Sequence, residues 1–155
     1  LAKACYERIR HKFQAKSFHD GVREDSKAHG MAGVQRKLSN SVMKRNIQDW
    51  AAGEAASWRN FLLDKKVLII LDDVDDSNHL RELCGKPDWF GKGSRIIVTT
   101  RNQRLLVQHD IATSYKVEGL NDAEALKLFS LHAFKKGQPE EVFLELSKYF
   151  INHAG

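Results

Sequence analysis

Two short apolar runs stand out from the otherwise amphipathic pattern of the chain, and they predict strands of a buried sheet. The first is Lys66–Leu71, within KKVLIILDD, and the second is Arg95–Thr100, within GSRIIVTTR. Both runs are rich in β-branched residues and have polar neighbours, which is typical of parallel strands covered on both faces. Weaker patterns predict an edge strand at Lys16–Val22 and a third strand at Tyr115–Val117, where apolar and polar residues alternate.

Helical periodicity fills the intervals between these runs. Apolar positions three or four residues apart predict helices at Leu1–Phe13, Met31–Val42, Ala55–Leu62, Leu80–Leu83, Leu126–Ala133 and Val142–Phe150, with another after Asn102. The residues suited to cap them are Ser77, Asn102 and Asn121 with Glu124 at the start, and Gly85 and Gly137 at the end. Strands separated by helices predict a doubly wound α/β fold with right-handed crossovers.

Composition narrows the class of protein without changing this fold prediction. The chain has 155 residues, of which 42% are hydrophobic and 29% charged, as in an ordinary globular domain. Its longest apolar run, Val67–Leu71, is far shorter than a membrane span, and the first residues lack the apolar stretch of a signal peptide. Cys5 and Cys84 have no metal-ligand spacing, so a reducing cytosol fits the cysteine usage best.

Charge argues against a nucleic-acid-binding face. The formal net charge is +5, but basic and acidic residues are mixed along most of the chain. The densest basic stretch, Arg8–Lys16, lies along a predicted helix whose opposite face is apolar. A solvated helix face is favoured there over a phosphate-binding patch.

Candidate chemistry lies where the first buried strand ends. Asp72 and Asp73 follow that strand directly, and ligands of open α/β sheets bind beyond the carboxyl ends of the strands. Magnesium would compensate two adjacent carboxylates while leaving positions for water and phosphate oxygens. The alternative interpretation is equally open from the residues alone: Asp73 or Asp75 caps a helix, and Asp72 is a solvated strand end.

The second buried strand ends in Thr99, Thr100 and Arg101, near the same edge of the sheet. The planar guanidinium of Arg101 is suited to bind a phosphate, or alternatively to pair with Asp72 or Asp73. The sequence contains no GxxxxGK[ST] phosphate loop, no HExxH and no GxSxG. The phosphate-binding site suggested by the strand ends is therefore expected to be incomplete.

Three long motifs resemble, in order and spacing, successive motifs of the NB-ARC nucleotide-binding domain of plant disease-resistance proteins: KKVLIILDDVDD (65–76), GSRIIVTTRN (93–102) and YKVEGLNDAEALKLFSLHAF (115–134). The segment FHDGVREDSKAHGMAGVQRKLS (18–39) resembles the subclass with an N-terminal Toll/interleukin-receptor (TIR) domain, although His19 and Asp20 stand where family members usually have apolar strand residues. The first residues resemble the helix after the phosphate loop, and His153–Gly155 resemble the start of the GLPL motif. The chain is therefore expected to be a fragment between those landmarks, as its uncapped first helix and missing initiator Met also suggest.

The resemblance implies a P-loop NTPase-like parallel sheet with flanking helices, lacking its first strand and phosphate loop. Residues 1–119 would form part of the α/β subdomain, and residues 120–155 would begin the adjoining helical (ARC) subdomain. In such domains ADP is held at rest, and exchange for ATP with Mg²⁺ activates the receptor, with at most slow hydrolysis. Asp72 matches the magnesium-binding acid and Asp73 the acid assigned to water activation, while Thr100 and Arg101 match nucleotide-binding positions, Arg101 sensing the terminal phosphate.

The resemblance also implies partners and a location. They are intramolecular TIR and leucine-rich-repeat domains, a homo-oligomer on activation and a pathogen effector, in the cytoplasm with the nucleus as a second location. Two other functions stay open at this point. One is a non-switching interaction module with a decayed nucleotide site, and the other is a turnover ATPase of another P-loop family.

Overall fold

The computed structural model describes residues 1–46, 48, 52–85, 87–109, 111 and 113–154. The chain divides into two compact units, Leu1–Thr113 and Ser114–Gly155, each of which is described by itself. Among the described residues, no helix combines bilayer-spanning length with a sufficiently apolar composition.

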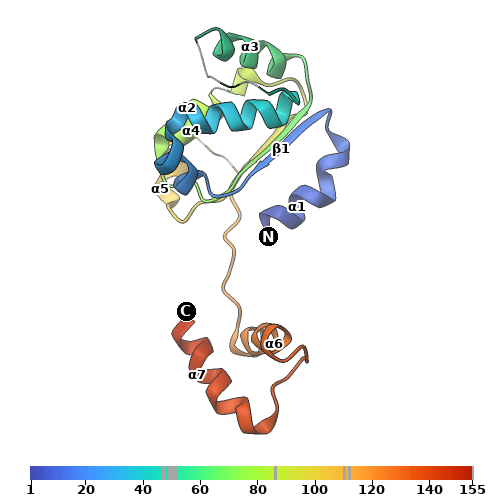
Figure 1. Ribbon diagram of the computed structural model, residues 1–155, viewed down its shortest axis with the longest axis vertical. Helices are drawn as coiled ribbons and strands as arrows, with labels where there is room; N and C mark the ends of the chain where they lie inside the picture. Colours follow the sequence, from blue (N-terminus) through green and yellow to red (C-terminus); the bar gives the residue numbers. More distant parts are fainter. Residues whose placement is uncertain (47, 49–51, 86, 110, 112, 155) are drawn as a thin grey trace. The chain divides into compact units, whose positions relative to one another are not determined.

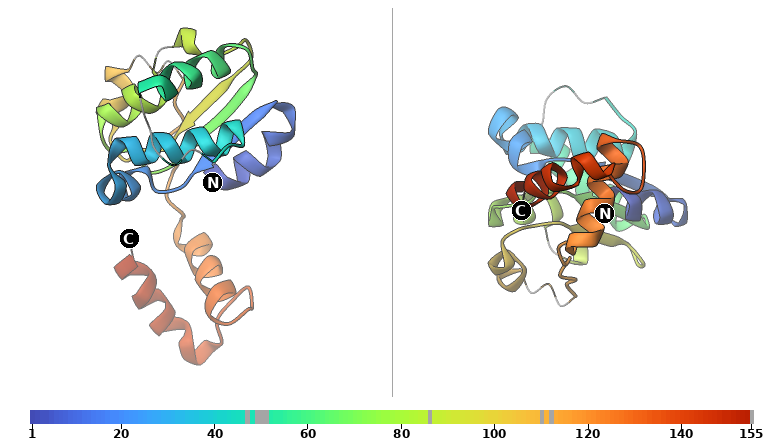
Figure 2. Two further views of the ribbon diagram at one scale, coloured as in Figure 1. Left: turned by 45° about the horizontal axis from the view of Figure 1, so that its top comes forward. Right: turned by 90° about the horizontal axis from the view of Figure 1, so that it is seen from below.

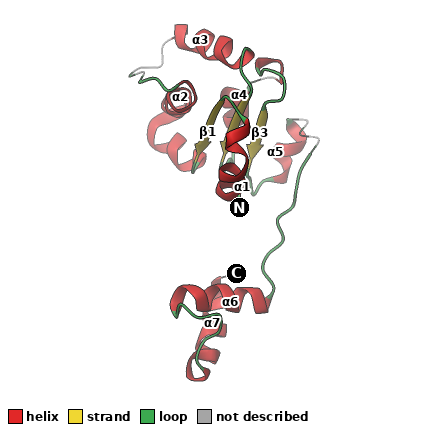
Figure 3. Cartoon of the chain, turned by 90° about the vertical axis from the view of Figure 1, so that its right-hand side faces the viewer, coloured by secondary structure: helices red, strands yellow, loops and turns green. Residues whose placement is uncertain are grey.

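The first unit contains a parallel sheet with the spatial order β1-β2-β3 (Figure 1). Its strands are β1 (Ala15–His19), β2 (Val67–Leu71) and β3 (Arg95–Val98). The register pairs Ala15 with Val67, and Leu68 with Arg95. Figure 3 shows the strands side by side with their helices around them. The predicted α/β class with a P-loop NTPase-like parallel sheet is confirmed.

The central strand β2 is buried along its whole length because both faces of the sheet are covered. Val67, Ile69 and Leu71 pack with apolar residues of α2 (Val22–Met43), α3 (Ala52–Leu63), α4 (Ser77–Cys84) and α5 (Gln103–Gln108). Leu68 and Ile70 pack on the other face with Phe13 and the helix α1 (Ala2–Ile9). Figures 1 and 2 show α1 and α2 on opposite sides of β1. The side chains on both faces of β2 are therefore apolar, as the sequence predicts for such a strand.

The N-terminal helix uses a face that overlaps only in part with the expected one. Leu1 is 79% exposed and Cys5 is also exposed, whereas Ala2, Tyr6 and Ile9 pack against the sheet. The helix ends at Ile9 and continues as the 3₁₀ turn η1 (Arg10–Lys12). Ile9 and Phe13 of the expected stripe do pack with the sheet, whereas Leu1 and Cys5 do not. The partly buried residues Ala2, Tyr6 and Ile9 follow the spacing i, i+4, i+7 of a regular helical face.

Helix α2 consists of two helical segments joined at Gly30, whose φ of 67° lies in the left-handed region that glycine tolerates. Val34, Leu38 and Val42 of its second segment are buried, as the periodicity predicts. Trp58 and Leu62 of α3 are buried as well. The buried residues of both helices pack in one cluster with Ala15 of β1 and Ile69 of β2.

Helix boundaries in the first unit follow the local chemistry closely. Asp76, one residue before the predicted Ser77, caps α4 by accepting a 2.7 Å hydrogen bond from the Asn78 amide. Gly85 ends this helix with a φ of 57°, and Asn102 caps α5, both as predicted. A short 3₁₀ turn, η2 (Pro87–Trp89), follows α4. The alternative that Asp73 or Asp75 caps the helix is wrong, because Asp76 has that role.

The second unit is a pair of helices, α6 (Asp122–Ala133) and α7 (Leu144–Ala154), with the 3₁₀ turn η3 (Glu141–Phe143) between them. Asn121 and Glu124 form the predicted capping box through two reciprocal 3.0 Å hydrogen bonds. Ring contacts join the helices, including stacked Phe129 and Phe150. Helix α6 ends at Ala133, before the predicted Gly137, with Phe134 as its C-cap, because Lys135 takes a left-handed φ of 57°.

The predicted third strand at Tyr115–Val117 is wrong. These residues have no regular structure, and the Tyr115 and Val117 side chains are 82% and 61% exposed. Alternation of apolar and polar residues forms a strand only where a neighbouring strand completes the hydrogen-bond ladder. No described strand pairs with this segment.

Candidate functional site

A cleft of about 460 Å³ lies at the carboxyl ends of the three strands. Its lining residues are Asp20, Gly21, Arg23, Glu24, Asp72, Asp73, Thr99, Thr100 and Arg101. They come from the β1–α2 loop, the start of α2 and the segments directly after β2 and β3. The four site residues predicted from sequence, Asp72, Asp73, Thr100 and Arg101, are thus brought together in one cleft.

Backbone hydrogen bonds position these segments by continuing the parallel ladder beyond the strands. The Asp72 amide donates to the His19 carbonyl at 2.9 Å, and the Thr99 amide donates to the Leu71 carbonyl at 3.0 Å. The Val74 amide donates to the Thr99 carbonyl at 2.9 Å. The two carboxylates and the threonine therefore leave the sheet from fixed positions rather than from a free loop.

Thr99 links the two acidic residues. Its Oγ1 donates to Asp72 Oδ1 at 2.5 Å and accepts the Asp73 amide at 2.9 Å. Thr100 Oγ1 instead accepts the Asn102 amide at 3.0 Å and shapes the turn into α5. From the sequence, Thr99 was assigned no role, although both Thr99 and Thr100 were placed at the end of the second strand.

Asp73 lies between two arginines. Arg23 Nη2 is 2.8 Å from Asp73 Oδ2, whereas Arg101 Nε is 4.0 Å from Asp73 Oδ1. The Arg101 side chain is 87% exposed, so its pairing with Asp73 is weak. Asp73 has a φ of 55°, a left-handed conformation that aspartate adopts more readily than most residues.

Arg23 is another residue of the cleft to which sequence reasoning assigned no role. It is the second residue of α2, and its amide donates to the Asp73 carbonyl at 3.3 Å. The sequence signal that could have indicated a role for Arg23 in the cleft was its position at the start of a helix that follows an edge strand. No spacing rule relates a residue there to one 50 positions later.

The carboxylates of the cleft suit a magnesium ion that is bound by one or two protein ligands, and not one that is enclosed by protein ligands alone. Among the described residues, no group of three or more His, Cys, Asp or Glu is arranged to hold a metal ion. Magnesium, however, usually takes one or two carboxylates and completes its shell with water and phosphate oxygens. Asp72 and Asp73 fit that mode, since they provide two adjacent carboxylates beside an open cleft.

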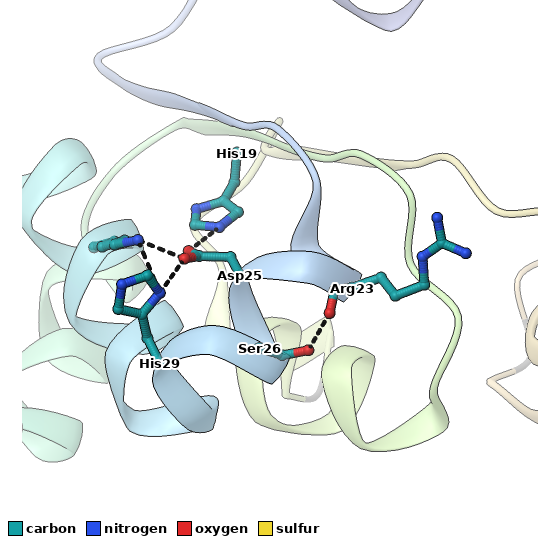
Figure 4. Close-up of polar contacts among 6 residues, drawn as sticks. His19, Arg23, Asp25, Ser26 and His29 are labelled. Atoms are coloured by element: carbon teal, nitrogen blue, oxygen red, sulfur yellow. Dashed lines mark hydrogen bonds and ion pairs between the residues drawn. The ribbon is translucent and has the colours of Figure 1, made fainter.

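A polar cluster beside the cleft explains why the edge strand ends in histidine. Asp25 accepts from Lys37, and Asp25 Oδ2 lies 3.0 Å from His19 Nε2 while Oδ1 lies 2.7 Å from His29 Nδ1 (Figure 4). Burial lowers the pKa of His19 despite the opposing effect of Asp25. Burial alone would raise the pKa of the Asp25 carboxyl, but Lys37 and the histidines outweigh it and lower that pKa. The Arg23 side chain points away from this cluster.

The chain is similar in sequence to one protein domain family and to disease resistance proteins of plants. A family model described as the NB-ARC domain matches residues 3–138. The chain is 37% identical over 158 residues to Disease resistance protein RPV1 of Vitis rotundifolia, covering 99% of this chain and 11% of that protein. It is 39% identical over 147 residues to TMV resistance protein N of Nicotiana glutinosa, covering 93% of this chain and 12% of that protein.

A further relative extends the comparison to another genus. Disease resistance-like protein DSC1 of Arabidopsis thaliana is 37% identical over 156 residues, which cover 99% of this chain and 13% of that protein. The chain thus spans a small part of the length of each of these relatives.

Proposed function

Because the chain belongs to the NB-ARC domain family, we propose that it forms part of the nucleotide-binding switch domain of a plant immune receptor. Support for the plant-defence setting comes from relatives that are named as disease resistance proteins. The observation that carries the nucleotide site is the single cleft that holds Asp72, Asp73, Thr100 and Arg101 at the strand ends. Family membership argues against a turnover ATPase of another family.

Each residue of the cleft has a proposed role. Asp72, oriented by the Thr99 hydroxyl, holds Mg²⁺ through a carboxylate oxygen. Mg²⁺ supplies charge neutralisation for the phosphates when it is bound. Asp73 orients water near the terminal phosphate, and Arg101, which is exposed and free to reach into the cleft, binds that phosphate. Thr100 holds the turn that presents Arg101.

The switch itself is proposed to run between an ADP-bound resting state and an ATP-bound active state. Residues 1–119 contribute to the α/β subdomain, and residues 120–155 begin the helical subdomain. The proposed partners are TIR and leucine-rich-repeat domains of the same receptor, further copies of the receptor on activation and a pathogen effector. The proposed location is the cytoplasm, with the nucleus as a second compartment.

The test compares nucleotide binding by an extended chain, meaning this sequence with its flanking segments through the phosphate loop, with binding by the Asp72→Ala variant. Titration calorimetry should show a larger loss of affinity for magnesium-ATP than for magnesium-free ADP, because Asp72 acts through the metal. Lys92→Ala, outside the cleft, is the control. Equal losses for the two nucleotides would contradict the magnesium assignment, and no binding by the unmodified extended chain would contradict the proposed function.

A further inference from the structure

Arg23 is held in the cleft more firmly than the other arginine. Its amide donates to the Asp73 carbonyl at 3.3 Å, and its carbonyl accepts the Ser26 hydroxyl at 2.9 Å. Its side chain is 33% exposed, against 87% for Arg101. Figure 4 shows the Ser26 contact and the Arg23 guanidinium extending away from Asp25 and His29. The Arg23 backbone is therefore anchored beside Asp73, and its side chain is less exposed to solvent than that of Arg101.

The charges of the lining show why this arginine matters. Four carboxylates line the cleft, those of Asp20, Glu24, Asp72 and Asp73, and its cations are Arg23 and Arg101. The lining therefore carries more negative than positive charge. A polyphosphate entering this space needs cationic contacts, and guanidinium groups bind phosphate oxygens with short, charge-assisted hydrogen bonds.

The Arg23 guanidinium also has donors to spare. Its Nη2 contacts Asp73 Oδ2 at 2.8 Å, while its buried Nε has no hydrogen-bond partner in the described part of the chain. The pair with Asp73 is partly exposed on both sides, at 33% and 26%. Ion pairs of this exposure contribute little to stability, so an anion of higher charge can displace Asp73 at low cost.

We propose that Arg23 binds the terminal phosphate of a nucleoside triphosphate in this cleft, in competition with Asp73. The inference rests on the proposed function and adds a specificity-determining residue to it. Because ADP lacks that phosphate, ADP leaves the Arg23–Asp73 pair in place. A triphosphate draws Arg23 away and thereby frees the Asp73 carboxylate at the moment when a water molecule must be oriented.

The first experiment measures binding of ADP and of magnesium-ATP to the full-length receptor carrying Arg23→Ala, by titration calorimetry. Loss of charge-assisted hydrogen bonds should weaken magnesium-ATP binding by about 10- to 150-fold. Binding of ADP should change much less. Arg23→Gln, which removes the charge but keeps a polar side chain, is measured alongside in case the alanine variant does not fold.

Arg45→Ala is the matched control. Arg45 pairs with Glu54 at 3.1 Å, and the side chains are 38% and 29% exposed, close to the values for Arg23 and Asp73. This pair lies outside the cleft lining. Its loss should leave both nucleotide affinities unchanged, which separates phosphate binding from a general effect of removing a partly exposed ion pair.

A double variant separates direct phosphate binding from an action through Asp73. If Arg23 binds phosphate, Arg23→Ala weakens magnesium-ATP binding in an Asp73→Asn background as well. An Arg23→Ala effect that vanishes in the Asp73→Asn background would overturn the proposal and leave Arg23 as a residue that merely positions Asp73.

The remaining outcomes distinguish a failure of the role proposed for Arg23 from a failure of the proposed nucleotide-binding function. If the unmodified receptor binds both nucleotides and the Arg23 variants bind them equally well, the assignment of Arg23 is wrong while the proposed function stands. If the receptor binds neither nucleotide, both are overturned.

Discussion

Replacing Thr99 by valine tests whether the link between the two carboxylates is a structural requirement of the cleft. Valine has nearly the shape of threonine and keeps the backbone hydrogen bonds of residue 99. It removes the hydroxyl that donates to Asp72 Oδ1 at 2.5 Å and accepts the Asp73 amide at 2.9 Å. The change is therefore confined to two hydrogen bonds.

The magnitude follows from the kinds of bond lost. A hydrogen bond to a charged group contributes about 1.5–3 kcal/mol, and one between neutral groups contributes about 0.5–1.5 kcal/mol. Residues 72, 73 and 99 are only partly buried, so water replaces part of both bonds. We expect Thr99→Val to lower the free energy of unfolding by roughly 2 kcal/mol, near the lower end of the combined range.

Urea unfolding of the extended chain, followed by circular dichroism, measures this change. Peptide-level hydrogen exchange provides a local readout, because the Asp73 amide loses its acceptor and should exchange faster. Thr99→Ser keeps the hydroxyl and should retain most of the stability. If the valine and serine variants unfold at the same urea concentration and the Asp73 amide stays protected, the reasoning about Thr99 is refuted.

Three further predictions follow from other parts of the chain. Arg101→Ala should weaken binding of magnesium-ATP more than binding of ADP, by roughly tenfold or more for the loss of a charged hydrogen bond; unchanged calorimetric titrations would remove its proposed role. Burial lowers the pKa of His19 in the folded protein, so as the pH falls the unfolded chain takes up a proton at this residue before the folded chain does. The free energy of unfolding should therefore decrease as the pH drops below about 6.5, the ordinary pKa of histidine, and level off below the pKa of His19 in the folded protein. Urea midpoints at successive pH values should show this dependence in the unmodified protein and lose it in His19→Gln. The edge of β3 opposite β2 has no partner among the described strands, so the 155-residue chain alone should self-associate; a monomer in sedimentation velocity at high concentration would count against this.

The buried central strand β2 was predictable because a strand covered on both faces has a distinctive local pattern, whereas β3, also predicted to be buried, is only partly buried. Each residue of β2 meets an apolar layer, so the run from Val67 to Leu71 contains no polar position. Capping is local in the same way: Asn102 and the pair Asn121 and Glu124 act on backbone groups within three residues. Such short-range chemistry leaves a direct trace in the order of the residues.

Predictions failed where the outcome depended on a distant partner. The alternating residues at Tyr115–Val117 have strand-like character, but no described strand accepts their hydrogen bonds. The first helix shows a smaller failure of the same kind. Its apolar residues allow two phases, and contact with Leu68 and Ile70 of the sheet selects the face that carries Tyr6 and Ile9.

The sequence alone determined which edge of the sheet carries the polar site, since parallel strands place their carboxyl ends together and Asp72, Asp73 and Arg101 follow those ends. The tertiary structure alone decided how these groups are connected. Thr99 reaches both acidic residues because β3 lies in register beside β2, and Arg23 reaches Asp73 because α2 begins beside the end of β2. These contacts join residues 26 or more positions apart, and their geometry depends on strand register and helix placement, which are set by packing of the whole unit rather than by any local pattern.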